Sequence, residues 1–421
     1  MLDELKNPIL VAGLLLFVGV LASKIANRIG VPSLLLFLLV GILAGSDTFT
    51  WIANVTGNPT WTGIPFDNYD YAKKIGELAL LVILFAGGLE TKWKTVRPVL
   101  LPGIILSTAG VLLTTLLLGL FSWFALTAFT SFDIGLGGLT FTEALLLAAI
   151  VSSTDAAAVF SVFRSTAVQP NPRLRSLLEF ESGSNDAMAV LLTITILGIM
   201  TGSEGSTWYV FGDLFQQLIF GVAVGALIGW AGAAMVSRLK FSARGIYPIF
   251  VLSFGLLSFG LAEQINGNGF LSVYVAGVVI GNRLKKNQES VVGFHDGLSW
   301  LSQIAMFILL GLLVNPSELW SVAWAASAMA LFLMLVARPI SVVSCLLPLR
   351  LKKKEIAYVS WVGLRGSVPI VLATFPSAYG IENSHLIFNI IFFIVILSIL
   401  VQGSTLVACA RWLKVTAKDD E

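Results

Sequence analysis

Apolar residues recur along this chain in long runs, separated by short polar connections from one end to the other. A helix needs about 20 mostly apolar residues to cross the hydrocarbon core of a bilayer. Read at that length, the pattern predicts thirteen transmembrane helices, at residues 8–26, 31–46, 72–90, 96–126, 139–163, 174–200, 208–237, 246–265, 268–282, 294–314, 318–348, 356–376 and 384–413. The connection 47–71 is expected outside the membrane, with short interfacial pieces.

Composition agrees with a chain that lies mostly in lipid. Hydrophobic residues make up 57% of it and charged residues 12%, and its mean hydropathy is +0.89. This balance excludes a soluble enzyme, a disordered chain and a receptor with a single span. Cys345 and Cys409 lie in apolar segments, so we interpret them as core residues and not as a disulfide or metal site. Residues 1–421 are expected to form one membrane domain, with no soluble regulatory domain.

Basic residues fall on alternate connections. Of the 26 lysines and arginines, 21 lie on one set of connections, three on the other and two inside predicted spans. The basic set consists of residues 24–28, 92–97, 164–175, 238–244, 283–286, 350–354 and 411–418. Because basic connections stay in the cytoplasm, the amino terminus is expected outside and the carboxyl terminus inside.

An odd number of spans permits two halves of opposite orientation. Residues 8–200 and 246–413 are expected to be inverted repeats around a linking helix at 208–237. The fifth span contains VSSTD (151–155), and the matching span of the second half, the twelfth, contains GLRGSVP (363–369). Paired interruptions of this kind are typical of transporters whose binding site lies at the middle of the membrane. The sequence predicts an all-α polytopic membrane protein in which broken helices 5 and 12 cross at that depth.

Five ionisable residues lie well inside the predicted spans: Asp155, Glu181, Asp186, Arg338 and Arg365. A charge near the bilayer centre costs about 2.5–3.5 kcal/mol on insertion scales, so each needs a partner or a purpose. Three carboxylates against two guanidiniums leave one negative charge. Either a proton or a desolvated alkali ion could neutralise it, but not both at once. Mutual exclusion at one carboxylate is a physical basis for ion exchange.

The spacing in the sixth span places oxygen atoms on one side of a helix. Glu181 and Asn185 are one turn apart, and so are Ser182 and Asp186. The broken fifth helix could bring its carboxylate and carbonyl groups to this stripe. Oxygen ligands suit a hard monovalent cation and argue against copper or zinc.

Other interpretations remain open from these residues. Asp155 and Asp186 could be structural, bonding free backbone amides or pairing with Arg338. The guanidiniums suit pairing with Glu181 or with the carbonyl groups of a broken helix better than they suit proton carriage. Two aspartates on neighbouring helices could also form an intramembrane protease dyad. An ion-coupled symporter of an organic solute is a further alternative, because it can share broken helices.

Six segments together resemble the monovalent cation/proton antiporters of the NhaP type, and most closely their CvrA-like potassium/proton branch. They are TDAA (154–157), ESGSND (181–186), GFLSVYVAG (269–277), MFILLGL (306–312), ARP (337–339) and GLRG (363–366). The likeness runs from the first predicted span to the last. It implies thirteen helices, a homodimer, and a mobile core domain that moves against a dimerisation domain.

The resemblance also implies roles for individual residues. Asp186 matches the main carrier of ion and proton, and Ser182 and Glu181 match residues that assist it directly or through water. Thr154 and Asp155 match a backbone oxygen ligand and the second carboxylate.

The remaining matches concern support and stoichiometry. Arg338 matches the arginine that holds the glutamate and the asparagine, and Arg365 is taken as structural support for the helix break. Asn185 stands where electrogenic relatives have another aspartate, which implies one-for-one electroneutral exchange. The expected cargo is K⁺ or Na⁺ against H⁺ across the inner (plasma) membrane, with no cofactor, no enzymatic activity and no nucleic-acid partner.

Overall fold

The computed structural model describes residues 7–29, 32–56, 63–128, 139–164, 168–202, 207–284 and 287–417. Within these ranges the chain is helical, with isolated bridges but no strand. The elements are α1 (Pro8–Ile29), α2 (Ser33–Ala44), α3 (Ser46–Thr56), α4 (Tyr69–Glu90), α5 (Trp93–Val96), η1 (Arg97–Val99), α6 (Leu100–Ile105), η2 (Leu106–Gly110), α7 (Val111–Ala128), α8 (Phe141–Ile150), α9 (Ala156–Arg164), α10 (Pro172–Met200), α11 (Thr207–Arg238), α12 (Ile246–Gln264), α13 (Gly269–Arg283), α14 (Gln288–Leu312), α15 (Pro316–Phe332), η3 (Leu333–Ala337), α16 (Arg338–Leu346), η4 (Leu347–Leu349), α17 (Lys353–Trp361), α18 (Ser367–Leu372), α19 (Phe375–Ala378) and α20 (Ser384–Trp412).

Several helices begin at a side chain that caps them. The side chains of Asn68, Asn171 and Asn268 accept backbone N–H bonds at the starts of α4, α10 and α13. Thr140 and Glu143 form a reciprocal capping box on α8. Such caps satisfy donors that have no partner within the helix, so polar residues between apolar runs fix where the helices begin.

The helices correspond to the predicted spans. In the described ranges, seven helices are long and apolar enough to cross a membrane: Pro8–Ala26, Trp93–Ala125, Pro172–Met200, Gly212–Arg238, Ile246–Gln264, Pro316–Leu349 and Ser384–Trp412. The other predicted spans coincide with α2, α4, α13, α14 and the broken pairs α8–α9 and α17–α18. The all-helical, multi-pass fold is thereby confirmed, whereas the total of thirteen spans stays a prediction. In the connection 47–71, α3 is the helical piece that the structure describes.

The helix of the tenth predicted span begins before the span does. Hydropathy placed the start of the span at residue 294, whereas α14 begins at Gln288. Its first turns contain Gln288, Glu289 and Asp296, which lower the local hydropathy although they are helical. A window that averages hydropathy finds the apolar part of such a helix and misses its polar beginning.

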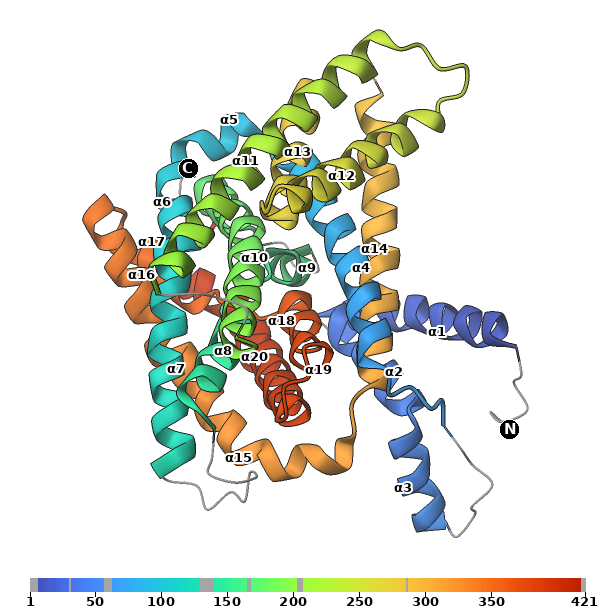
Figure 1. Cartoon of the computed structure of the whole chain (residues 1–421), viewed down its shortest axis with the longest axis vertical. Coiled ribbons are helices and arrows are strands. Elements are labelled where there is room, and N and C mark those ends of the chain that lie inside the picture. Colours follow the sequence, from blue (N-terminus) through green and yellow to red (C-terminus); the bar gives the residue numbers. More distant parts are fainter. Residues whose placement is uncertain are drawn as a thin grey trace.

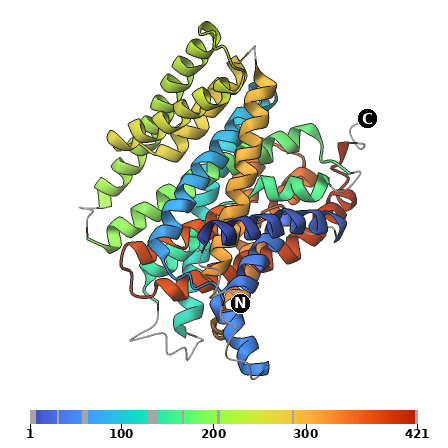
Figure 2. The ribbon, with the colours of Figure 1, turned by 90° about the vertical axis from the view of Figure 1, so that its right-hand side faces the viewer.

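The helices form two groups that meet along the middle of the molecule (Figures 1 and 2). The first group contains α2, α4 and α11–α14, which contact one another as α11–α13, α4–α13, α2–α14 and α4–α14. The second contains α6–α10 and α15–α20, joined by contacts such as α7–α8, α15–α20 and α8–α10. Helix α1 packs on α2 and α14 and projects from the side of the first group.

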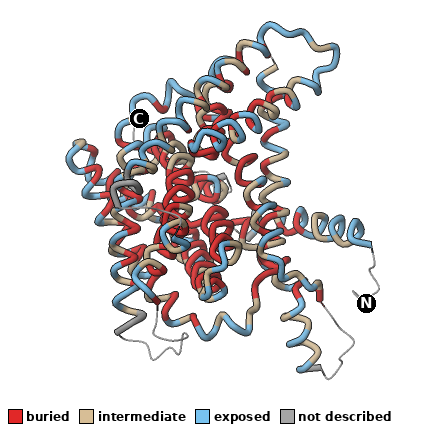
Figure 3. Tube along the Cα trace, in the orientation of Figure 1, coloured by how far each residue is buried: buried red, intermediate tan, exposed pale blue. Residues whose placement is uncertain are grey.

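Burial separates the two groups further. Buried residues are concentrated in α8, α10, α18 and α20, whereas α1 and much of α11 and α12 are exposed (Figure 3). The exposed side chains there include large apolar ones such as Phe17, Phe215 and Trp230. Apolar surface of this kind suits contact with lipid tails. The polar residues singled out above therefore lie in the most enclosed part of the second group.

Candidate functional site: two broken helices and α10

Two helices are interrupted at the centre of the second group. Between α8 and α9, residues 151–155 are not helical, and between α17 and α18, residues 362–366 are not helical. Both predicted interruptions are confirmed, although the second is shorter than the GLRGSVP segment because α18 already begins at Ser367. Each interruption releases backbone N–H and C=O groups that need partners in a medium without water.

The two interruptions supply part of those partners to each other. The Asp155 N–H donates to the Leu364 carbonyl at 2.7 Å. The Arg365 Nη1 atom donates to the carbonyls of Ser152 at 2.5 Å and Ser153 at 2.7 Å. The side chain of Arg365 is buried and sits just beyond the carboxyl end of α8, where a helix presents negative partial charge. Arg365 therefore neutralises a helix end and holds the crossing together.

Asp155 lies at the opposite, positive ends. Its Oδ1 atom accepts the Ala158 N–H at 2.9 Å in the first turn of α9. Gly366, which precedes α18, packs against the same carboxylate so closely that a Cβ at Gly366 would overlap it. Helix amino termini favour negative charge. Two of them thus face Asp155 in a protein interior.

Helix α10 clamps the unwound segment from the other side. Ser182 Oγ donates to the Thr154 carbonyl at 2.8 Å and accepts the Ala156 N–H at 2.9 Å. The Asn185 side-chain amide donates to Thr154 Oγ1 at 2.7 Å, and its oxygen accepts the Thr154 N–H at 3.3 Å. Both ends of the Asn185 amide are therefore engaged with Thr154, and α10 fixes the shape of the break.

Glu181 and Arg338 form a buried ion pair. Glu181 Oε1 lies 2.6 Å from Arg338 Nη1, and the two side chains are 1% and 3% exposed. Arg338 directly follows η3, a π-helical turn of the kind that often occurs at functional sites. The backbone of Gly363 lies against the same side chain. The pair thus joins α10 to α16 next to the second interruption.

Asp186 faces a cavity together with Asp155. The cavity has a volume of about 490 Å³, and Asp155, Ser182, Asp186 and Ser367 line it. Among the described residues, neither aspartate forms a salt bridge with a lysine or arginine. Counting charges along the sequence predicted one unpaired carboxylate, but the structure leaves two. The reason is that Arg365 binds backbone carbonyls in place of a carboxylate.

The cavity runs between the two helix groups toward the basic connections. Its lining includes Lys92, Thr95, Pro172 and Arg175 from the basic connections, and Asp296 from α14. An ion at that end of the molecule can therefore approach the aspartates through polar space. Positive and negative charges both lie along this route, since the Arg175 guanidinium is paired with the Glu179 carboxylate at 2.9 Å.

Among the residues of this cavity that sequence reasoning missed are Ser367 and Tyr274. Ser367 is the first residue of α18 and lies in the GLRGSVP segment, which was interpreted only as a helix break. Tyr274 lies in the GFLSVYVAG segment without a role, yet its ring fills the space beside Gly183, and its hydroxyl lies 3.5 Å from Thr91 Oγ1. The sequence signal for this close approach of Tyr274 to α10 was Gly183, which has no side chain.

Comparison with known proteins agrees with this architecture. Residues 13–412 match the family model described as the transmembrane sodium/hydrogen exchanger. The chain belongs to the sodium/hydrogen exchanger family. It is therefore a multi-pass membrane transporter that exchanges cations for protons, and not an enzyme. An intramembrane protease and a symporter of organic solutes are set aside by this membership.

Several curated relatives of this exchanger are named for potassium. It is 40% identical over 413 residues to the K(+)/H(+) antiporter NhaP of Alkalimonas amylolytica, covering 98% of this chain and 68% of that protein. It is 40% identical over 417 residues to the K(+)/H(+) antiporter NhaP2 of Shewanella sp. (strain ANA-3), again covering 98% and 68%. The predicted resemblance to the NhaP type and its potassium branch is confirmed.

A solved structure shares the fold of this exchanger. The sodium proton antiporter MjNhaP1 from Methanocaldococcus jannaschii, solved at pH 8, superposes with a TM-score of 0.80 at 24% identity. The match covers 96% of this chain and 98% of that one. At this identity the likeness establishes the fold alone.

Proposed function

We propose that this exchanger moves one K⁺ or Na⁺ against one H⁺ by alternating access, and that the two ions compete for Asp186. The observation that carries the proposal is the pair Asp155 and Asp186, which share a cavity and, within the described part of the chain, have no guanidinium partner. A carboxylate in that position needs a cation to remain charged away from water. Proton and metal ion meet this need in turn.

The cation is proposed to bind to Asp186, Asp155, Ser182 and Thr154. These residues offer carboxylate, hydroxyl and backbone carbonyl oxygens within one break and the helix turn that clamps it. Oxygen ligands of this kind suit a hard cation. Glu181, Arg338, Asn185 and Arg365 hold the frame and are supporting residues.

A one-for-one stoichiometry is supported by how the polar groups are used. Asn185 carries no charge and is bonded to Thr154 at both ends of its amide. Asp155 is held at two helix amino termini, whose partial positive charges favour an anion in that position. Only Asp186 is left to exchange its proton for a cation, so each cycle carries one of each.

The wider arrangement is proposed on the sequence pattern. The alternation of basic connections supports an extracytoplasmic amino terminus and a cytoplasmic carboxyl terminus in the inner membrane. The two broken helices, in matching places of 8–200 and 246–413, support inverted repeats around the linking helix α11. A homodimer, with the second helix group moving against the first, is proposed as the assembly.

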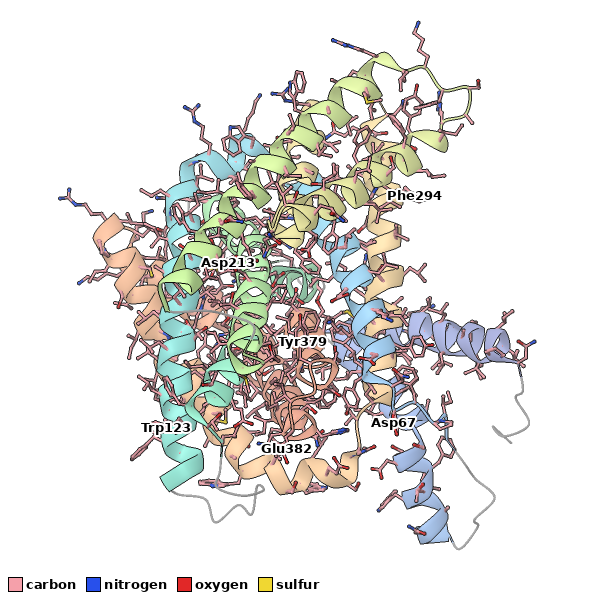
Figure 4. All side chains as sticks on the ribbon, viewed as in Figure 1. Asp67, Trp123, Asp213, Phe294, Tyr379 and Glu382 are labelled. Carbon is pink, nitrogen blue, oxygen red and sulfur yellow. The ribbon has the colours of Figure 1, made fainter. Side chains whose placement is uncertain are left out.

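Transport in proteoliposomes tests the proposal. Addition of K⁺, Na⁺ or Li⁺ to vesicles that contain a pH-sensitive dye should release protons with the wild type and not with Asp186→Asn. Asp213→Asn is the matched control, because it makes the same change in α11, where Figure 4 labels the residue and its carboxylate bonds Gln217 at 2.6 Å. Exchange retained by Asp186→Asn would exclude Asp186 as the carrier, and the alkali series ranks the cations.

A further inference from the structure

Four lysines gather around a hollow that is separate from the ion pathway. The hollow has a volume of about 390 Å³. Lys352, Lys353 and Lys354 enter it from the start of α17, and Lys414 enters it from the residues that follow α20. Asn171, Glu355 and Val415 complete the lining. Two segments of chain about sixty residues apart thus contribute positive charge to one concave site.

The fold fixes Lys414 in this place. The segment after α20 is tied to the residues before α10, since the Asn171 N–H donates to the Val415 carbonyl at 3.0 Å and the Ala417 N–H donates to the Gln169 carbonyl at 2.9 Å. Lys414 itself has a φ of 52°. Non-glycine residues adopt this left-handed conformation infrequently, and it occurs here where the chain leaves α20. Backbone hydrogen bonds therefore fix the position of the fourth lysine.

The positive charge of the hollow is not neutralised from within. Glu355 is the carboxylate that lines it, but this side chain is 3% exposed and its Oε2 accepts the Lys352 N–H at 3.2 Å as a cap of α17. Among the residues that the structure describes, none of the four lysines forms a salt bridge. The preference for basic cytoplasmic connections explains lysines on a loop, but it does not explain their convergence on a cavity.

We infer that this hollow, defined by Asn171, Lys352–Lys354 and Lys414, binds a phosphate group. Ammonium groups recognise phosphate as point charges and can surround it from several directions. The surroundings favour the headgroup of an anionic lipid as the source. Trp412 and Leu347 lie close in sequence to the lysines, and they are 82% and 56% exposed. Exposed tryptophan beside lysine is typical of the level of lipid headgroups.

A phosphate group bound in this hollow would connect helices α10 and α17, which carry parts of the ion site. Asn171 caps α10, the helix of Asp186, and Lys352 precedes α17, which ends at the second interruption. A phosphate bound by Lys352–Lys354 on one side and by Lys414 on the other, whose segment is hydrogen-bonded to Asn171, holds the starts of these two helices together. A ligand that binds only the folded protein raises its stability, so the occupied site should raise the unfolding temperature of the whole exchanger.

Binding of phosphatidylglycerol to the purified full chain tests the inference. We expect native mass spectrometry to show that it is retained in preference to phosphatidylcholine and that it raises the unfolding temperature. Each lysine near an anionic surface contributes about 1 kcal/mol, so Lys352→Gln/Lys353→Gln/Lys414→Gln should weaken this binding by about a hundredfold at low salt. The charge-matched control Lys94→Gln/Lys240→Gln/Arg283→Gln removes three exposed basic residues from other connections and should bind as the wild type does.

Further arms separate the sources of phosphate and guard against misfolding. If inorganic phosphate at millimolar concentration raises the unfolding temperature of the wild type and displaces the lipid, the site accepts phosphate from solution as well. If it does neither while phosphatidylglycerol binds, the ligand is the lipid. Lys352→Arg/Lys353→Arg/Lys414→Arg keeps the charge and should bind as the wild type does, which would show that the glutamine variant lost binding through its charge and not through misfolding. Equal phosphatidylglycerol binding by the glutamine variant and the control would overturn the inference.

Discussion

Gly366 has no room for a side chain, because a Cβ there would occupy the space of the Asp155 carboxylate. Gly366→Ala must therefore push that carboxylate away from the amino terminus of α18. Overpacking of this kind costs about 1–3 kcal/mol, and 1.4 kcal/mol corresponds to about a tenfold change. We expect cation affinity, measured as the cation concentration for half-maximal exchange in proteoliposomes, to weaken by about tenfold or more.

The neighbouring Gly363 provides the matched control. A Cβ at Gly363 would lie 3.4 Å from Cγ and Nε of Arg338, which is an ordinary van der Waals contact. Gly363→Ala should leave half-maximal exchange close to that of the wild type. Equal effects of both alanines would show that the helix break is sensitive to any side chain and that the contact with Asp155 has no special role.

The Glu181–Arg338 pair predicts a stability effect that is separate from transport. Removing one partner leaves the other charge buried and unpaired, which is destabilising by about 3–5 kcal/mol, whereas replacing both by apolar residues is often neutral. Arg338→Met should therefore lower the unfolding temperature in detergent strongly, and Glu181→Met/Arg338→Met should recover most of it. If the double variant is no more stable than the single one, the pair is not what makes Arg338 necessary.

At the scale of elements, α4 closes the path to the aspartates at the end opposite the basic connections. Gly76 of α4 packs on Val371 of α18, and the Lys73 ammonium lies 4.8 Å and 4.7 Å from the ring centroids of Phe375 and Tyr379. Tyr379, labelled in Figure 4, directly follows α19. The first helix group thus contacts the second here, whereas toward the basic connections the cavity separates them.

Alternating access requires this contact to open, and a disulfide can test the requirement. A Cβ built at Gly76 lies 3.5 Å from the Val371 Cβ, which suits a disulfide once the valine methyl groups are removed. In a background without Cys345 and Cys409, oxidised Gly76→Cys/Val371→Cys should lose exchange in proteoliposomes and regain it on reduction. Each single cysteine variant should be unaffected by oxidant. Continued exchange by the fully cross-linked protein would show that α4 and α18 need not separate.

The sequence predicted the elements better than their ends. Both interruptions were visible because polar, glycine and proline residues break otherwise apolar runs at 151–155 and 363–369. The span predicted at 294–314 leaves out the start of α14, because Gln288 and Glu289 are helical but polar. Hydropathy measures how well a segment suits lipid and not whether it is helical. The two properties differ wherever a helix begins in water.

Partner choice inside the site could not be read from the sequence. Charge counting identified five ionisable residues inside the predicted spans but not that Arg365 binds the carbonyls of Ser152 and Ser153. That choice depends on the crossing of two segments more than two hundred residues apart, which places a helix carboxyl end next to the guanidinium. The convergence of Lys414 with the lysines at the start of α17 could not be predicted from the sequence either, because these segments are also far apart along the chain.

For the whole molecule, a shared site predicts how acid affects transport. If proton and cation compete for Asp186, protons raise the cation concentration needed for half-maximal exchange but leave the maximal rate unchanged at saturating cation. Once protons occupy most of the sites, each unit fall in pH should raise that concentration by about tenfold, since simple competition is linear in proton concentration. This half-maximal concentration can be measured in dye-based exchange assays at several pH values. The pH should be equal on both sides before cation is added. A maximal rate that falls with acid while half-maximal concentration stays constant would mean that protons act at a second place, and the single-carboxylate mechanism would then be wrong.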